Sequence, residues 1–302
     1  MASKTIPYIF STLLFLLQLQ FSAGQTEVKA AYWFSGTGLS VSGIDSTLFT
    51  HLFCAFADLD PTTYQVSISS SNLAQFSTFT TTVQQANPSV QTLLSIGGRG
   101  GDVIAQSFAS MASQASTRKT FIDSSIQLAR SYNFYGLDLD WEYPSTATEF
   151  TNLGLVLDEW RAAVASEATS SGNTPLLLVA AFYYSSNYDG LTYPIQDISN
   201  SLDWVNVMTY DFIAPGWSPN VTGPPAALYN PTSQVSGDSG ITAWIQAGVS
   251  ADKLELGVPF FGYAWTIVTY AKGNGLLGYF AWQLGQDPNF VLSQAASSAW
   301  GA

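Results

Sequence analysis

Three carboxylic acids recur at every second position in one short, otherwise apolar segment. Residues 134–144 read FYGLDLDWEYP, with the acids at Asp138, Asp140 and Glu142. In a β-strand these side chains share one face, about 6.6 Å apart per pair, and the apolar residues between them share the other. Acids crowded in a poorly solvated place cannot all ionise, so at least one pKa is expected to be raised and a proton shared. Such a carboxyl group can act as a general acid near neutral pH.

The same three acids could also be solvated side chains at a surface edge, or a cage for Mg²⁺ or Ca²⁺. A cage usually draws oxygen ligands from several loops, and the flanking sequence offers none beyond the strand. Perturbed carboxylates gather at active sites, so acid catalysis is the preferred interpretation. Neither a metal nor another cofactor is expected.

Eight short apolar runs, separated mostly by segments long enough for a helix, surround these acids. Nearly continuous apolar runs alternating with helices are typical of a parallel sheet covered on both faces. Eight such units predict an α/β fold, a single-domain (β/α)8 TIM barrel whose chemistry lies at the C-terminal ends of the strands. The runs are 28–34, 52–56, 92–96, 136–141, 176–182, 204–210, 254–261 and 276–282.

The connection between the seventh and eighth runs is unusually short. Only residues 264–274 lie between Tyr263 and Gly275, whereas a crossover between parallel strands needs about a dozen residues including its helix. The seventh helix is therefore expected to be shortened, to one or two turns, or missing. Apolar side chains on strands seven and eight would then be exposed, and self-association through this flank is expected. The candidates are Leu256, Val258, Leu277 and Phe280, of which strand alternation lets only some point outward.

The first 24 residues have the order of a secretory signal peptide. Lys4 precedes an apolar run at 6–17, and small residues at 22–24 precede Gln25. A retained membrane anchor is the alternative, but the run is shorter than the roughly 20 residues that a membrane-spanning helix needs. We expect cleavage after Gly24, a catalytic barrel over residues 25–302, no membrane association after cleavage, and an extracellular or vacuolar destination.

Composition narrows the function further. The formal net charge is −12 and the sequence pI is about 4.1, which argues against nucleic-acid partners. His51 is the single histidine, so a Ser-His-Asp triad or a His-rich metal site is set aside, and the single cysteine, Cys54, is predicted to be a core residue. The many aromatic residues suit a neutral sugar polymer, although most should lie in the core. Residues 220–222 form a sequon that could carry a glycan at Asn220.

Four motifs together resemble glycoside hydrolase family 18, and the mature chain is similar to the plant class V chitinases of that family. The acids match the D-x-x-D-x-D-x-E signature, and residues 95–98 (SIGG) match S-x-G-G, the least specific of the four. Residues 208–211 (MTYD) match M-x-Y-D, and residues 279–282 (YFAW) carry the tryptophan of the eighth strand. The motifs occur in the family's order on the expected strands, which makes the match specific.

This resemblance implies a secreted hydrolase of chitin or N-acetylglucosamine oligosaccharides, acting in chitin catabolism and defence. Glu142 would protonate the glycosidic oxygen, and the substrate's own acetamido oxygen would be the nucleophile, so that the endo-acting enzyme retains the anomeric configuration. Asp140 would orient the acetamido group while Asp138 shares a proton beneath it. Tyr210 would donate its hydroxyl to the acetamido oxygen.

The resemblance also implies residues that hold the sugar. Trp282 would form the floor beneath the distorted ring, and Asp211 would bind the same sugar. Lesser contacts are expected from Met208, Tyr32, Phe56 and Gly98. For Gly97 and Gly98 a purely structural role in a tight turn is the alternative.

Two features depart from the family pattern. Tyr135 stands where the family has its first aspartate, and the segment after Trp265 lacks the small α+β insertion that forms one wall of the cleft in class V relatives. A shallower groove is therefore expected. A chitin-binding lectin or hydrolase inhibitor is the alternative function, which loss of Glu142 or Tyr210 would favour, and both are present. An inert, storage-like barrel would have a degraded fourth strand, and this one is intact.

Overall fold

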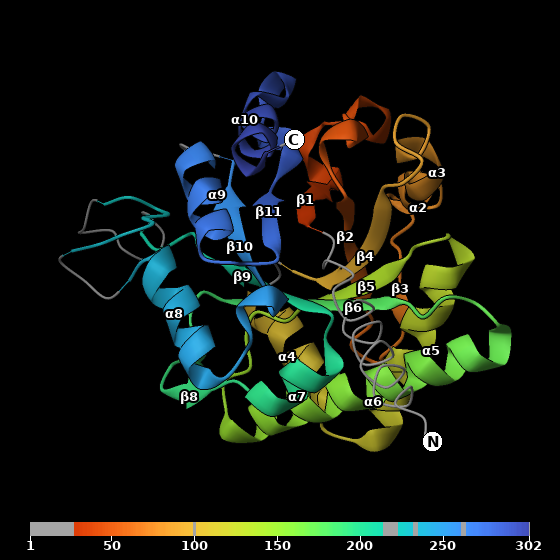
Figure 1. Cartoon of the computed structure of the whole chain (residues 1–302). Helices are drawn as coiled ribbons and strands as arrows, with labels where there is room; N and C mark the ends of the chain where they lie inside the picture. Colours follow the sequence, from red (N-terminus) through yellow and green to blue (C-terminus); the bar gives the residue numbers. More distant parts are fainter. Residues whose placement is uncertain (1–26, 99–100, 214–222, 232–234, 261–263, 302) are drawn as a thin grey trace, which may run out of the picture.

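Eight parallel strands form one closed sheet in the computed structural model, which describes residues 27–98, 101–213, 223–231, 235–260 and 264–301 (Figure 1). Each strand pairs with the next one along the chain, and β1 pairs with both β2 and β11, which closes the ring. The predicted (β/α)8 barrel is confirmed, and each of the eight apolar runs overlaps a strand. They are β1 (Val28–Phe34), β2 (His51–Leu59), β4 (Gln91–Gly97), β5 (Gly136–Asp140), β6 (Leu177–Tyr183), β9 (Trp204–Met208), β10 (Leu254–Pro259) and β11 (Gly278–Trp282).

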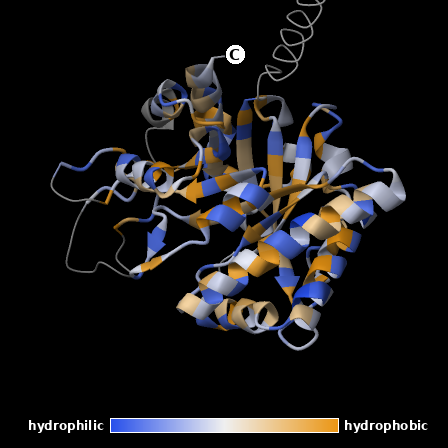
Figure 2. Ribbon diagram, turned by 60° about the horizontal axis from the view of Figure 1, so that its bottom comes forward, coloured by the Kyte–Doolittle hydropathy of each residue, from blue (hydrophilic) through white to orange (hydrophobic). Residues whose placement is uncertain are grey.

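Helices surround this ring, with hydrophobic and hydrophilic residues alternating along them as expected for amphipathic helices (Figure 2). The short β3 (Val66–Ser67) pairs antiparallel with β2, and β7 (Asn187–Tyr188) with β8 (Leu191–Thr192) forms a separate hairpin. The helices are α2 (Leu73–Phe76), α3 (Phe79–Val83), α4 (Gly101–Ala112), α5 (Ala115–Ser131), α6 (Ala147–Ser171), α7 (Ile195–Ser201), α8 (Gly237–Ala247), α9 (Ala264–Gly273) and α10 (Val291–Trp300).

Alternation along the strands divides the apolar residues between two clusters. One lies inside the barrel and includes Ala30, Phe53 and Val179, and the other lies between the strands and the helices. Cys54 belongs to the outer cluster and is a buried free cysteine, which confirms its predicted place in the core. The inward face of each strand therefore ends at the rim where the predicted site residues gather.

The longest helix, α6, is bounded by residues suited to its ends. The Thr146 side chain accepts a hydrogen bond from the backbone N–H of Glu149 at the N-terminus, and Gly172 adopts a left-handed conformation (φ 75°) at the C-terminus. This helix begins five residues after Glu142, so its cap fixes the end of the loop that carries the acid.

The seventh crossover differs from the prediction. It is a helix of ten residues, α9, longer than one or two turns although much shorter than the 25-residue α6. It packs against β10, β11 and α10, and Val268 and Ala271 on it are fully buried. The expected exposed flank is therefore wrong. Leu256 and Val258 are covered by the helical layer, Leu277 and Phe280 point into the barrel, and all four are buried.

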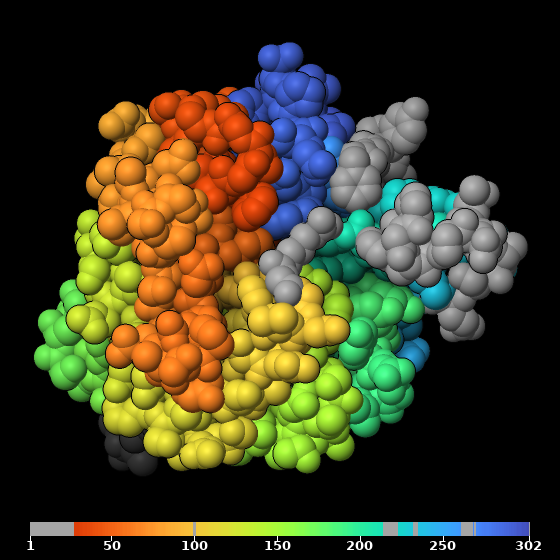
Figure 3. Space-filling model, turned by 180° about the vertical axis from the view of Figure 1, so that it is seen from behind, coloured from red at the N-terminus to blue at the C-terminus, as the bar shows by residue number. Residues whose placement is uncertain are grey.

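Segments from both ends of the sequence lie side by side on the surface, as the β1–β11 pairing requires (Figure 3). Within the described ranges, no helix combines the length and apolar character needed to span a bilayer. The predicted signal peptide and the Asn220 sequon lie outside the described residues.

Candidate active site

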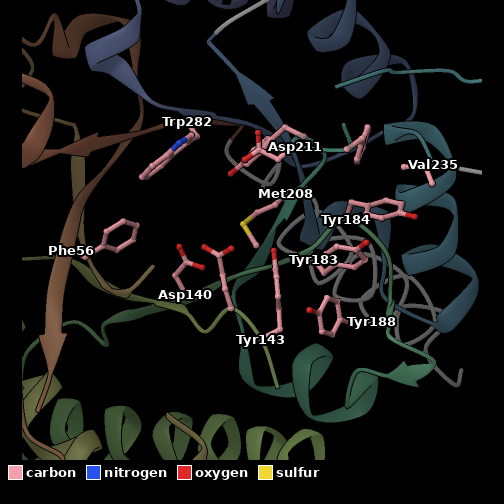
Figure 4. A pocket seen from close by; sticks show the side chains of 13 residues that line it. Phe56, Asp140, Tyr143, Tyr183, Tyr184, Tyr188, Met208, Asp211, Val235 and Trp282 are labelled. Carbon is pink, nitrogen blue, oxygen red and sulfur yellow. The ribbon is translucent and has the colours of Figure 1, made fainter. Parts of the chain in front are cut away.

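A cavity of about 550 Å³ opens at the C-terminal ends of the barrel strands. Figure 4 shows Phe56 and Trp282 on one side of it and Tyr183, Tyr184 and Tyr188 on the other, with Asp140 between the two groups. The cavity therefore has aromatic walls around a carboxylate floor. Its lining residues are Phe56, Asp140, Glu142, Tyr143, Tyr183, Tyr184, Tyr188, Met208, Tyr210, Asp211, Phe212, Val235 and Trp282.

Asp138 lies beneath the cavity in a hydrogen-bond network inside the barrel. It is fully buried, and its Oδ2 accepts hydrogen bonds from the Ser95 hydroxyl (2.6 Å) and the Tyr32 hydroxyl (2.8 Å). Asn206 donates to the Tyr32 hydroxyl (2.8 Å) and accepts from the Trp204 indole N–H (3.0 Å). Tyr32 is buried as well, so its hydroxyl orients Asp138 from below and does not line the cavity.

Burial perturbs both acids of β5. Desolvation raises the pKa of Asp138 to about 6, although the hydrogen bonds from Ser95 and Tyr32 oppose this rise. The pKa of Asp140 is raised well above its usual range by desolvation and by the charges of Glu142 and Asp138. Oδ1 of each aspartate accepts no hydrogen bond from a described residue. A carboxyl oxygen that accepts no hydrogen bond can carry a proton at the least energetic cost. The Asp138–Asp140 pair is therefore arranged to retain one proton between its two carboxyl groups.

Glu142 lies two residues beyond the end of β5 and lines the cavity, half-buried. Its charge also raises the pKa values of Asp140, Tyr143 and Tyr210, which places it electrostatically close to all three. Tyr143 and Tyr210 both have pKa values well above the usual range, because of burial first and the neighbouring acids second. Their hydroxyl groups therefore stay protonated and can donate hydrogen bonds to a ligand.

Met208, Tyr210 and Asp211 bring the end of β9 into the cavity. Asp211 has a left-handed backbone conformation (φ 59°), so the chain turns sharply there. Thr209, between Met208 and Tyr210, points the other way, and its hydroxyl donates to the Gly257 carbonyl of β10 (2.6 Å). This alternation holds Tyr210 toward the acids of β5.

The indole of Trp282 forms one wall together with other rings. Its centroid lies 5.7 Å from that of Phe56, 6.0 Å from Phe34 and 5.8 Å from Tyr32. A rigid aromatic face of this kind suits stacking against a sugar ring. Across the cavity, Tyr188 on the β7–β8 hairpin lies 4.5 Å from Tyr143 and 4.9 Å from Tyr183, ring centroid to ring centroid.

Gly97 and Gly98 hold the backbone close to the site. Both have positive φ (106° and 71°), and the Gly98 N–H donates to the Asp140 carbonyl (2.8 Å). A Cβ on Gly97 would collide with the Asp140 carbonyl oxygen, and one on Gly98 would collide with the Phe56 ring. Gly98 does not line the cavity, so the structural alternative describes its place better than a sugar contact does.

Seven of the ten sequence-predicted site residues line one cavity, and three lie behind it. Those behind are Asp138, Tyr32 and Gly98. Tyr135, at the position of the family's first aspartate, is exposed before β5 and lies away from the cavity. The prediction missed Tyr143, Tyr183, Tyr184, Tyr188, Phe212 and Val235. A position directly after an apolar run could have identified Tyr183 and Tyr184, because it places them at the C-terminal rim.

The arrangement suits acid chemistry on an uncharged ligand. The lining residues that the structure describes include three acids and five tyrosines but no Lys or Arg. The described residues contain no group of three or more His, Cys, Asp or Glu side chains placed to hold a metal ion. A half-buried Glu142 above a proton-retaining aspartate pair can protonate a leaving oxygen, and neutral phenols can hold polar groups beside it.

Comparison with known proteins places this geometry in a family. Residues 25–274 match the model of glycosyl hydrolases family 18. The chain belongs to this family. Its sequence is 48% identical to a class V chitinase from Arabidopsis thaliana, with 100% of this chain and 97% of that protein aligned. The family-18 resemblance inferred from the four motifs is thereby confirmed.

Two solved plant structures have the same fold over most of this chain. The class V chitinase from Nicotiana tobaccum, solved as a mutant in complex with NAG4, matches with a TM-score of 0.89 and 42% identity, over 91% of this chain and 99% of that one. A chitinase-like agglutinin from Robinia pseudoacacia matches with a TM-score of 0.87 and 48% identity, over 91% of this chain and 100% of that one.

The Arabidopsis alignment also shows that this family-18 chain is short. It extends over 371 positions, whereas the chain has 302 residues, so the relative carries sequence that has no counterpart here. This difference in length agrees with the prediction that the chain lacks the α+β insertion of class V relatives.

Proposed function

We propose that this family-18 chain is a chitinase that cleaves β-1,4-linked N-acetylglucosamine polymers, with Glu142 as the general acid. The observation that carries the proposal is the buried Asp138–Asp140 pair beneath Glu142, in a cavity with aromatic walls. A class V chitinase as a relative, and a related chitinase in complex with NAG4, support chitin oligosaccharides as ligands.

The mechanism assigns one task to each residue. Glu142 protonates the glycosidic oxygen, while the substrate's acetamido oxygen attacks the anomeric carbon and gives an oxazolinium-like intermediate. Asp140 accepts a hydrogen bond from the acetamido N–H, Tyr210 donates to the acetamido oxygen, and Asp138 holds the proton that Asp140 releases. Trp282 supports the distorted ring. The enzyme is endo-acting and retains the anomeric configuration.

A turnover assay on soluble chito-oligosaccharides tests this assignment. Glu142→Gln should lower kcat by about 10²–10⁴-fold, because the amide cannot donate the proton. Its affinity for the oligosaccharide should change little, since the amide keeps the shape of the side chain. Near-normal turnover by the variant would show that another group is the acid.

Substrate-assisted catalysis makes a second demand, on the substrate. Fully deacetylated chitosan lacks the nucleophilic acetamido oxygen, so it should be a very poor substrate compared with the acetylated polymer. Proton NMR of the first product should show the anomer of the substrate. Rapid cleavage of chitosan, or an inverted first product, would contradict the mechanism.

A chitin-binding lectin is the second candidate, favoured by the structural similarity to the chitinase-like agglutinin. The same assay separates the two functions. A lectin would bind the oligosaccharide without turning it over, and Glu142→Gln would then leave its activity unchanged at zero.

We also propose that the protein is secreted after cleavage behind Gly24, to the vacuole or the cell exterior, for chitin catabolism and defence. The order of charged, apolar and small residues at the N-terminus supports this. N-terminal sequencing of the protein from its source should give Gln25 as the first residue.

A further inference from the structure

Asn206 is a buried amide that the proposed mechanism does not use. It lies in the middle of β9, is fully buried and does not line the cavity. Both polar atoms of its side chain have partners. The Trp204 indole N–H donates to Oδ1 (3.0 Å), and Nδ2 donates to the Tyr32 hydroxyl oxygen (2.8 Å). Because Asn206 lies out of reach of a substrate, it can act on hydrolysis only through these neighbours.

The chemistry of the partners fixes the direction of each of these hydrogen bonds. An indole N–H can only donate, so the amide atom that faces Trp204 is the oxygen, and the amide nitrogen is left to face Tyr32. The Tyr32 oxygen therefore accepts from Asn206, and its hydroxyl hydrogen is left to donate to Oδ2 of Asp138 (2.8 Å). The His51 ring packs edge-on against the Trp204 indole, with centroids 5.1 Å apart, and holds the indole in this place.

Asp138 receives the result of this arrangement on one oxygen only. The Ser95 hydroxyl also donates to Oδ2 (2.6 Å), so Oδ2 accepts two hydrogen bonds, whereas Oδ1 accepts none from a described residue. A proton on Oδ2 would have to displace one of the two donors. The proton that Asp138 carries is therefore directed to Oδ1, the oxygen that remains for sharing it with Asp140.

We propose that Asn206 is a positioning residue for hydrolysis: its amide, oriented by Trp204, makes Tyr32 a donor to Asp138 and so directs the proton of Asp138 to Oδ1. The role rests on the proposed function. Accepting a hydrogen bond from Asn206 also polarises the Tyr32 hydroxyl, which makes it a stronger donor to Asp138. Asn206 thus acts on the acids of β5 from a neighbouring part of the barrel without touching them.

The other titratable groups that interact with the charge of Asp138 make no printed contact with the Asn206 side chain. They are Asp140 on β5, Tyr210 beyond the end of β9, and Glu255 on β10, which is in register with Asn206. Neither oxygen of Glu255 accepts a hydrogen bond from a described residue, so the Asn206 amide does not donate to it. Substitution of Asn206 therefore changes the hydrogen bond of Tyr32 and leaves these acids and phenols in place.

A double-mutant cycle with Tyr32 tests this role. Asn206→Leu is similar in size but cannot donate, so Tyr32 loses the partner that directs its hydrogen to Asp138. We expect kcat to fall roughly tenfold, the loss of about one buried hydrogen bond, at nearly unchanged KM. In Tyr32→Phe the same substitution should have little further effect, because both act through one hydroxyl group. Independent losses in the two variants, or a change in KM alone, would overturn the proposal.

Thr80→Val is the matched control for loss of a buried hydrogen bond. The Thr80 hydroxyl is buried and bonded to the Thr92 hydroxyl (2.6 Å), but Thr80 lies on α3, outside the barrel. This variant should lose stability and keep its kcat. If Asn206→Leu does not fold, Trp204→Phe keeps an aromatic ring and removes the N–H that orients the amide, and kcat should again fall at constant KM. An unchanged kcat in Trp204→Phe would then overturn the proposal.

Carboxyl ¹³C NMR separates this proposal from the chitinase proposal, because it needs no turnover. A hydrogen bond to an ionised carboxylate favours that form, so the apparent pKa values of the Asp138–Asp140 pair should rise by roughly half a unit or more in Asn206→Leu. Asp138→Asn assigns the signals. An unmoved titration would overturn the role of Asn206 even in an active enzyme. A shifted titration in a chain without turnover would support the hydrogen-bond arrangement and contradict only the chitinase proposal.

Discussion

At the scale of single residues, depth along the barrel axis decides which side chains a substrate can reach. Asp138, Asp140 and Glu142 follow one another at every second position, yet Asp138 is fully buried whereas Glu142 lines the cavity. Tyr32 lies at the lower level, where its hydroxyl favours the ionised form of Asp138. Within this one motif, Glu142 lies where a substrate can reach it, whereas Asp138 lies deeper and can only support the residues above it.

Gly98 lies behind the cavity beside Phe56, so it allows a test of a residue that supports the site without lining it. In Gly98→Ala the new methyl group would meet the Phe56 ring, and alanine is also strained at φ 71°. We expect the free energy of unfolding to fall by about 2–4 kcal/mol from strain and overpacking together. Displacement of Phe56 should also raise KM for oligosaccharides, provided that the chain is a chitinase.

The matched control is Gly172→Ala. Gly172 has a similar φ of 75° at the end of α6, but a Cβ there would meet no atom within 4 Å. The free energy of unfolding of this variant should fall only by the cost of backbone strain, about 1 kcal/mol, as measured by urea denaturation. Equal losses in the two variants would show that the contact with Phe56 does not matter.

At the scale of elements, α9 shows how few residues a crossover needs. Ten residues suffice because α9 packs against β10, β11 and α10, with Val268 and Ala271 fully buried. The prediction of an exposed flank assumed that a short connection could not hold a useful helix. It failed because α9 together with α10 covers the outer face of these strands.

Val268 tests the importance of this short helix. Val268→Ala removes two buried methyl groups from the contact with the barrel and should lower the free energy of unfolding by about 2 kcal/mol. Val291→Ala, on the exposed start of α10, is the control and should change it little, since Val291 is 60% exposed. Thermal or urea unfolding measures both, and an unaffected Val268→Ala variant would mean that α9 contributes little to the fold.

At the scale of the whole molecule, the interior acids link stability to pH. The pKa of Asp138 is about 6 in the folded chain, above its ordinary value of 3.8, and that of Asp140 is also raised. Each of these acids keeps a proton in the folded state that it has lost in the unfolded state, so its contribution to stability falls as pH rises from about 4 to above 6. His51 acts in the opposite sense over this range, because burial lowers its pKa from 6.5 to about 4. Glu167, whose pKa is lowered by Arg130, acts in the opposite sense at lower pH.

We therefore expect the unsubstituted protein to lose about 2 kcal/mol more of its free energy of unfolding between pH 4.5 and pH 7 than Asp138→Asn loses. Urea denaturation at the two pH values measures the difference. The amide of Asp138→Asn carries no proton that the folded state must retain, and the contribution of His51 is common to both proteins. Equal losses in the two proteins would show that Asp138 is less perturbed than its burial implies.

The sequence by itself determined the order of the eight strands and the residues that meet at their ends. Those inferences depend on local periodicity, since alternation places every second side chain inward and parallel strands bring their C-terminal ends to one rim. The resemblance to the family, read from the sequence, also determined seven residues of the cavity, six of them in three of the motifs and Phe56 on the second strand. Strand periodicity is sufficient for the first inference, and the short motifs that carry the resemblance are sufficient for most of the second.

Only the tertiary structure decided how deep each residue lies and what covers it. Tyr188 reaches the cavity through the β7–β8 hairpin, and Glu255 stands beside Asn206 because β9 and β10 are neighbours in a particular register. The cover over strands seven and eight is likewise a matter of packing between α9 and α10. Depth, register and helix packing join residues far apart in the chain, so no local pattern of one sequence contains them.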